Sequence, residues 1–159
     1  MGLDIFIATN NYKDVFTIDY FKNEKEFRLK MSLSRDFCNL MCRQRTAKGI
    51  PEFVQVAQLA QVDITSILDM ENGSTNIDSV YQTITQLLER LSKIDNLEGK
   101  INHDGYDRTG IEYYFSDFNL DKGEGYTGNN FGQDLRNFKR FLEYAKSKGT
   151  TDVSFEYGS

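Results

Sequence analysis

The sequence predicts an α+β domain with a small mixed or antiparallel sheet and helices mainly on one face. Short segments of alternating apolar and polar residues lie far apart in the chain, and the segments between them show helical periodicity. The length of 159 residues is typical of one domain, and no internal repeat or linker divides residues 1–159. We therefore expect a single domain, with a three-layer α/β fold as the alternative.

Four segments are expected to form the strands. Apolar and polar residues alternate in Leu3–Ala8, in Phe27–Leu33 and in Asp152–Tyr157, which is the period of a half-buried strand. The aromatic run Ile111–Phe115 is the fourth candidate. Asp14–Phe21 fits neither the strand period nor the helix period, so it receives no assignment.

Two long segments are expected to form amphipathic helices. In Phe131–Lys148 and Ile77–Ile94 the apolar residues recur at helical spacing and line one face. The stripe of the second helix either packs on the domain's own sheet or contacts another copy in an oligomer. Candidate caps precede both helices: Asn129 or Asn130 for the first, and Thr75 or Asn76 for the second.

The middle of the chain is expected to hold shorter helices and a polar loop. The expected elements are a helix capped by Ser32 or Ser34 with Phe37–Cys42 on its apolar side, a helix over Pro51–Val62, a short turn over Ile64–Met70, and a loop over Asn96–Gly110. None of these segments carries a known catalytic motif, so they predict structure alone.

Composition restricts the class of protein. Hydrophobic residues make up 39% of the chain and charged residues 27%, with 12 Phe and 9 Tyr, which is a globular profile. The net charge of −5 argues against general binding of nucleic acid or of anionic membranes. No apolar run approaches the roughly 20 residues of a membrane span, and no signal peptide is recognised. The two cysteines are then reduced thiols, and we expect a cytoplasmic protein.

The first residues carry a resemblance. The opening Met1-Gly-Leu-Asp-Ile-Phe6 resembles the start of small uncharacterised bacterial and phage proteins that begin MGLD and continue with a strand. The resemblance covers these residues only. It implies a bacterial or phage origin, and it implies no activity.

A glycine-rich loop offers a nucleotide-binding hypothesis. Gly123-Glu-Gly-Tyr-Thr-Gly128 has the G-x-G-x-x-G spacing, between a strand candidate and a helix candidate. Such glycines let the backbone approach a pyrophosphate at a helix N-terminus. Against this hypothesis, Ser116–Lys122 separates strand from glycines, and the carboxylates of Asp121 and Glu124 would repel phosphate. The alternative is a structural loop that covers a sheet edge or caps the helix. The candidate ligand-binding residues are Gly123, Gly125, Tyr126, Thr127, Gly128 and Asn130.

The patterns predict no metal, no cofactor and no catalytic residue. Asp117, Asn119 and Asp121 alternate as in a calcium loop, but Lys122 occupies the glycine position. Cys38 and Cys42 share a helix face with no further cysteine to complete a zinc site. Two further features each have an ordinary structural interpretation. His103-Asp104 is either an acid–base pair or a surface histidine, and Arg136, Lys139, Arg140 and Lys146 with Asp134 and Glu143 form an ordinary salt-bridged helix face.

Two functions remain open. The first is a non-enzymatic interaction module of the immunity or accessory type, which binds a basic protein through an acidic, tyrosine-rich surface. The second is a nucleotide or small-molecule binder that uses the Gly123–Gly128 loop. The candidate partner-binding residues for the first function are Asp104, Tyr106, Asp107, Asp117, Asp121 and Glu124.

Overall fold

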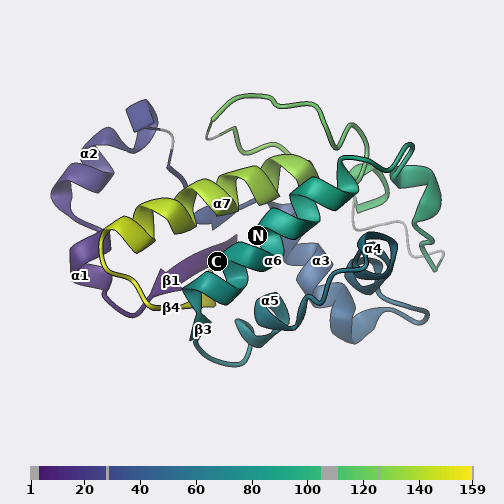
Figure 1. Cartoon of the computed structure of the whole chain (residues 1–159), viewed down its shortest axis with the longest axis horizontal. Coiled ribbons are helices and arrows are strands. Elements are labelled where there is room, and N and C mark those ends of the chain that lie inside the picture. Colours follow the sequence, from purple (N-terminus) through teal and green to yellow (C-terminus); the bar gives the residue numbers. More distant parts are fainter. Residues whose placement is uncertain (1–3, 28, 105–110, 125, 159) are drawn as a thin grey trace.

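The computed structural model describes residues 4–27, 29–104, 111–124 and 126–158. These residues form seven α-helices, two 3-10 helices and four strands. In chain order the elements are β1 (Asp4–Thr9), α1 (Tyr12–Val15), α2 (Ile18–Phe27), β2 (Ser32–Leu33), α3 (Arg35–Thr46), α4 (Glu52–Ala60), α5 (Thr65–Asp69), β3 (Thr75–Asn76), α6 (Ile77–Leu91), η1 (Glu98–Lys100), η3 (Ile111–Tyr113), α7 (Phe131–Ser147) and β4 (Asp152–Gly158). Figure 1 shows their arrangement.

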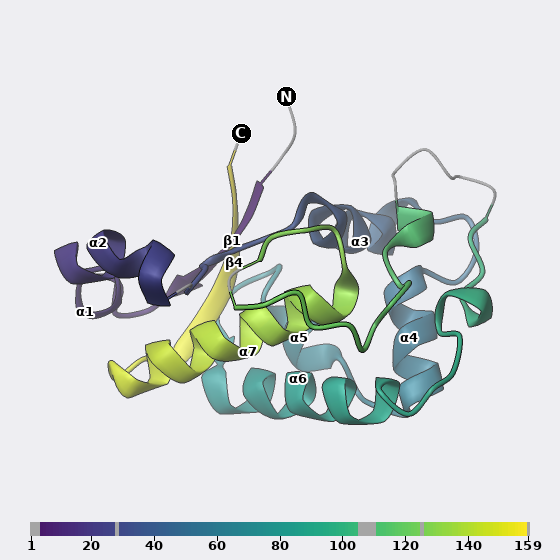
Figure 2. The same cartoon turned by 90° about the horizontal axis from the view of Figure 1, so that it is seen from above.

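The sheet is antiparallel, which confirms the predicted α+β class. Its strand order is β2-β1-β4-β3, and each neighbouring pair in the described chain is antiparallel. The two long strands are in the centre and pair along their whole length, from Asp4 opposite Gly158 to Thr9 opposite Val153. Figure 2 shows the first and last strands side by side, with both chain ends on the same side of the molecule. The three-layer α/β alternative, which needs parallel strands, is wrong.

One face of the sheet contributes to the core. Ile5 and Ile7 of β1 and Val153 and Phe155 of β4 are buried, whereas Glu156, on the other face, is exposed. This alternation is the period-2 pattern of a strand with helices on one side. The helices lie mainly on that side, as predicted from the sequence (Figures 1 and 2).

The two long helices form the main layer. α6 packs alongside α7, and the apolar stripe of each is buried between the helices and the sheet. The stripe of α6 therefore belongs to the domain's own core. The sequence alone had allowed either this packing or a contact in an oligomer. The buried stripe residues are Ile77, Val80, Ile84, Leu87 and Leu91 in α6, and Phe131, Leu135, Phe138, Leu142 and Ala145 in α7.

Three of the predicted capping residues are confirmed. The side chain of Ser34 accepts a hydrogen bond from the amide of Phe37 at the start of α3. Asn76 accepts from the first turn of α6, and Asn130 accepts from the amide of Gln133 in α7. Each cap satisfies amides that have no partner inside their own helix, so these residues define where the helices begin.

The predicted strand over Ile111–Phe115 is wrong. This segment is the 3-10 helix η3, followed by turns. Ile111 and Tyr114 are buried while Tyr113 is exposed, and a spacing of three between buried residues suits a 3-10 turn. As a consequence, no strand leads into the glycine loop.

The N-terminal third also differs from prediction. The unassigned segment forms α1 and α2, and α2 continues to Phe27, where a strand was predicted. Of the predicted strand Phe27–Leu33, only Ser32–Leu33 is extended and paired, as β2. α1 and α2 lie at one end of the molecule (Figure 1), where Phe16 stacks on Phe141 and the hydroxyl of Tyr144 donates to the carbonyl of Val15.

Candidate functional site

Side chains of α7 hold the backbone of the glycine loop. The amide of the buried Gln133 accepts from Lys122 N at 2.9 Å and donates to Gly123 O at 3.0 Å. The amide of Asn137, also buried, donates to Tyr126 O at 2.7 Å. Because these bonds run to main-chain atoms, they fix the course of the loop and leave its own side chains free to point outward.

The first part of the loop is fixed in the same way. Arg136 donates to Phe118 O at 3.1 Å and to Leu120 O at 2.8 Å. The contact is close at Gly132, where a Cβ atom would lie 2.2 Å from Phe118 O. Only glycine permits this approach. The loop therefore covers the polar side of α7, and Asn130 at its end caps that helix.

The N-terminus of α7 has little capacity left for a phosphate group. The side-chain oxygen of Asn130 accepts a hydrogen bond from the backbone amide of Gln133, and the backbone amide of Phe131 donates to Tyr114 O at 2.9 Å. The amide of Asp134 donates within the first turn. A dinucleotide fingerprint needs these amides and a preceding strand, and here the amides are bonded and the strand is a 3-10 helix.

The candidate ligand-binding residues lie in different surroundings. Tyr126, Thr127 and Gly123 are exposed, Gly128 is partly buried, and Asn130 is the buried cap. Gly125 lies outside the described residues. No cavity found among the described residues is lined by this set together.

The candidate partner-binding residues separate into two groups. Asp117, Asp121 and Glu124 are exposed on the loop. Asp104 is largely covered, and its carboxylate accepts from Arg43 Nη2 at 2.8 Å and from Lys48 N at 2.6 Å. Asp104 thus serves a contact inside the protein. Tyr106 and Asp107 lie outside the described residues.

Large apolar groups are exposed on this loop and in η3 just before it. Tyr113 is 75% exposed, Leu120 52% and Tyr126 44%. We call the set Tyr113, Asp117, Leu120, Asp121, Glu124 and Tyr126 the acidic loop surface. Its main counter-charges in the described chain are Lys122, above the Tyr126 ring, and Arg136, 4.0 Å from Asp121. Aromatic residues such as tyrosine are enriched at protein interfaces.

A groove adjoins this surface. It has a volume of about 550 Å³ and lies between residues 94–98 and residues 115–120, and we call it the acidic groove. Asp95 and Glu98 line one wall, and Asp117 lines the other. The walls are joined by hydrogen bonds from Phe115 N to Glu98 Oε2 at 3.2 Å and from Asn119 Nδ2 to Ser92 O at 2.9 Å.

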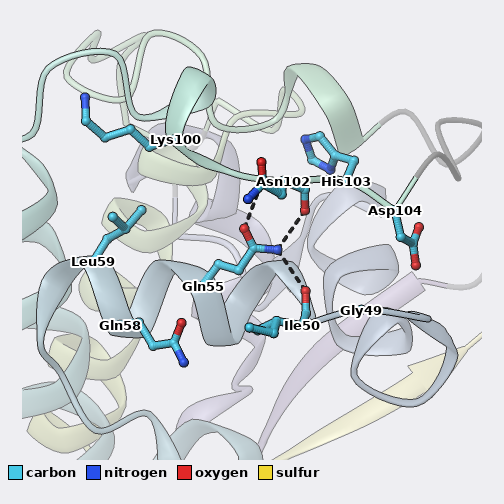
Figure 3. Close-up of a pocket in the computed structure, with 9 residues that line it drawn as sticks. All are labelled: Gly49, Ile50, Gln55, Gln58, Leu59, Lys100, Asn102, His103 and Asp104. Carbon is cyan, nitrogen blue, oxygen red and sulfur yellow. Dashed lines mark hydrogen bonds between the residues drawn. The ribbon is translucent and has the colours of Figure 1, made fainter.

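A second hollow lies between α4 and residues 100–104, with a volume of about 520 Å³ (Figure 3). Gln55 forms its inner side by donating to Ile50 O and Asn102 O and by accepting from Asn102 N, all at 2.7–2.8 Å. Exposed Ile50 and Leu59 contribute apolar surface. Among the described residues, the lining holds amides, the ammonium of Lys100, the imidazole of His103 and the carboxylate of Asp104, but no hydroxyl or thiol.

Buried charges lie behind this hollow. Arg43 Nε lies 3.1 Å from both carboxylate oxygens of Glu52, and both side chains are almost fully buried. His103 lies with Nδ1 3.6 Å from Glu52 and Nε2 3.5 Å from Glu98. Both ring nitrogens are shielded from solvent, and Asp104 turns to Arg43 instead. The proposed His103–Asp104 acid–base pair is therefore not formed.

A buried carboxyl connects α7 to α3. Asp134 accepts from Ser34 Oγ at 2.5 Å, from Ser34 N at 3.1 Å and from the hydroxyl of Tyr114. Burial raises the pKa of Asp134 to about 6, although the hydrogen bonds from Ser34 and Tyr114 lower it. The predicted place of Asp134 on an exposed salt-bridged face is wrong, and its role in the described contacts is structural.

Both cysteines are free, and Cys38 is poorly reactive. Cys38 is buried and Cys42 partly buried on the same helix. Burial raises the pKa of the Cys38 thiol to about 11, with a smaller contribution from Cys42, so the thiolate is scarce near neutral pH. Within the described ranges, no group of three or more His, Cys, Asp or Glu residues could hold a metal ion.

Sequence reasoning missed half of the groove. The sequence singles out Asp117, but Glu98 belongs to the predicted polar loop Asn96–Gly110, and Asp95 lies just before that loop. No local pattern in the sequence pairs residues 94–98 with residues 115–120. The charge cluster of Arg43 and Glu52 was missed for the same reason, because it joins a helix end to the start of the next helix.

Comparison with known proteins gives no further lead. No family model, no curated protein and no solved structure matches this chain. In the part of the chain that is described, no helix combines the length and the apolar character needed to cross a membrane. The function must therefore be inferred from the site itself.

Proposed function

We propose that the protein is a non-enzymatic interaction module that binds a basic protein partner through the acidic loop surface. The main observation that supports this proposal is that side chains of α7 form hydrogen bonds to the backbone of this loop. Asn130, Gln133 and Asn137 are buried, and all three use their amides on the backbone of the loop. Asp117, Asp121 and Glu124 are thereby presented to solvent on a fixed main chain. A surface fixed before binding loses less conformational entropy on binding.

Charge supports a basic partner. The chain has a net charge of −5, and the acidic loop surface concentrates carboxylates beside exposed tyrosines. Complementary charge raises association rates and selects against acidic partners. Binding should then weaken as the salt concentration rises, because ions screen the attraction between opposite charges. At 1 M salt the Debye length is only about 3 Å.

The interior chemistry favours a binding role over catalysis. The ring nitrogens of His103 are shielded from solvent, and the thiol of Cys38 stays protonated near neutral pH. A small acidic protein that covers a basic one would act as an immunity or accessory protein does. Free thiols match a reducing compartment, so we propose the cytoplasm as its location.

A charge reversal tests this function. Asp121→Lys with Glu124→Lys changes the acidic loop surface, and Asp69→Lys with Glu89→Lys changes net charge equally at exposed sites elsewhere. In pull-downs from lysate of the native host at low salt, wild type and control should capture the same basic protein, and the loop variant should not. About 1 M salt should release it. Thermal melts check that both variants are folded.

Two outcomes would refute the proposal. If the loop variant captures the same protein as wild type, the acidic loop surface is not the binding surface. If wild type captures nothing specific at low salt, the protein has no basic partner in that host.

A further inference from the structure

We propose that the acidic groove takes a single arginine side chain of that basic partner. This inference rests on the proposed function and names the chemical group that the partner inserts. The groove is continuous with the acidic loop surface, because Asp117 and Leu120 belong to both.

The shape of the groove suits a long side chain. Its volume of about 550 Å³ lies in the range of sites that enclose a small ligand. Phe115 and Phe118 line it and are buried, and Ile94 lies at its edge. Leu120, which is 52% exposed, and Ile94 give apolar surface for the methylene stem of an arginine.

The charges of the groove come from two directions. Asp95 lies on one wall and Asp117 on the other, and both are exposed. Within the described residues neither carboxylate forms an ion pair. Lys100, the neighbouring cation, donates to the main-chain oxygen of Asp95. Glu98, on the same wall as Asp95, bonds to Phe115 N and faces His103. A cation from outside would therefore meet two available carboxylates.

Arginine suits this arrangement better than lysine. A guanidinium is planar and directs five N–H donors outward, so it can bond to carboxylates on two walls at the same time. An ammonium is a compact, strongly hydrated charge with three donors. The segment already binds one guanidinium on its other side, where Arg136 donates to the carbonyls of Phe118 and Leu120.

The walls are held in place before any ligand arrives. Asn119 bonds to Ser92 O, Phe115 N bonds to Glu98, and Arg136 supports the segment from the side of α7. The hollow beside α4 differs, because the carboxylate of Asp104 already accepts hydrogen bonds from Arg43 and from Lys48 N. The groove thus offers the carboxylates of Asp95 and Asp117 to a partner.

Short blocked peptides test the inference directly. They are identical except for the central residue, which is arginine, lysine or citrulline, and binding is followed by amide chemical shifts at low salt. The arginine peptide should bind at least about tenfold tighter than the citrulline peptide, which is 1.4 kcal/mol, and tighter than the lysine peptide. The shifts should cluster in residues 94–98 and 115–120.

Groove variants provide the matched control. Asp95→Asn with Asp117→Asn removes both charges and keeps the shape. Asp117 has a φ of 51°, a conformation that asparagine also accepts. This variant should lose the preference for arginine over citrulline. Asp69→Asn with Glu89→Gln removes the same charge elsewhere and should keep the preference.

The outcomes separate this inference from the proposed function. Equal binding of arginine and lysine peptides, shifts outside the groove, no binding of the arginine peptide, or an unchanged preference in the groove variant would each overturn the arginine site. The proposed function is tested separately, by the pull-down with the Asp121 and Glu124 variant. Those two residues lie outside the groove lining.

Discussion

Individual carboxyl groups in this protein have opposite roles, and burial decides which role each has. Glu52 and Asp104 are held by Arg43 inside the protein, where removing one partner of a buried pair typically costs about 3–5 kcal/mol. The exposed pair of Lys93 and Glu89, at 3.8 Å, belongs to a class worth about 0–1 kcal/mol. Carboxylates of the first kind maintain the fold, and only exposed ones are available to a partner.

Asp134 is the residue for which pH should matter most. Its pKa is raised from 3.8 to about 6, chiefly by burial. The folded protein therefore binds this proton more tightly than the unfolded chain does. The resulting stabilisation is complete below pH 3.8 and is lost as pH rises through about 6.

Asp134→Asn should remove this dependence. Between pH 4.5 and pH 7 the wild type should lose on the order of 2 kcal/mol of stability relative to the variant. Urea unfolding of both proteins across this range measures the difference. A constant difference would show that Asp134 has the same pKa in the folded and unfolded states.

At the scale of elements, α7 has two functional faces. Phe138 and Leu142 belong to its apolar stripe in the core, and Gln133, Arg136 and Asn137 on its polar side hold the loop. A helix normally directs its polar side to water. Here that side is covered by the loop, so buried amides on α7 are needed to satisfy the loop's backbone.

Gln133→Leu should loosen the loop without unfolding the helix. Lys122 N and Gly123 O would lose their partner, at a cost of about 1–3 kcal/mol. Hydrogen exchange at the Lys122 amide should accelerate by roughly tenfold to a hundredfold, while α6 amides stay protected. Gln82→Leu on the exposed side of α6 is the control. Unchanged exchange at Lys122 would mean that other contacts hold the loop.

The sequence predicts the long elements well and the short ones poorly. α6 and α7 show several turns of regular periodicity, and Asn76 and Asn130 cap them as predicted. Ile111–Phe115 is too short for its period to distinguish a strand from a turn, and its buried residues follow a spacing of three. β2 holds only two residues, because α2 extends through Phe27 into the predicted strand.

The site was predictable only where it is local. Asp117, Asp121 and Glu124 lie within one loop, and their exposure follows from its polar composition. Asp104 was misplaced because its partner Arg43 is 61 residues away. Asp134 was misplaced because Ser34 is 100 residues away. Contacts at such separations leave no periodic pattern in the sequence.

At the scale of the whole molecule, the sheet is closed by segments near the two ends of the described chain. β1 and β4 are the central strands, and Asp4 lies opposite Gly158. Register partners in an antiparallel pair have Cα atoms about 4.5–5.5 Å apart. The two ends of the sheet could therefore be joined by a short linker.

A circular permutant checks this geometry. Gly158 is joined to Asp4 by a flexible linker of about five residues, and the chain is opened at the exposed turn of Asn72 and Gly73. The permutant should fold, with a melting temperature within roughly 8 °C of wild type, as a loss of up to about 2 kcal/mol implies. A permutant opened between Val80 and Tyr81, inside α6, should not fold. If both permutants folded, or if neither did, this architecture would be contradicted.

The pairing of β1 with β4 also affects how the protein is made. The ribosome releases β1 early and β4 only after nearly all of the described chain, so Ile5 and Ile7 leave the ribosome long before their partner strand exists. The central ladder therefore forms after synthesis of β4, and the nascent chain keeps apolar surface available to chaperones until then. A prematurely terminated chain lacks β4, one of the two central strands, so β1 has no partner on that side and the sheet cannot be completed.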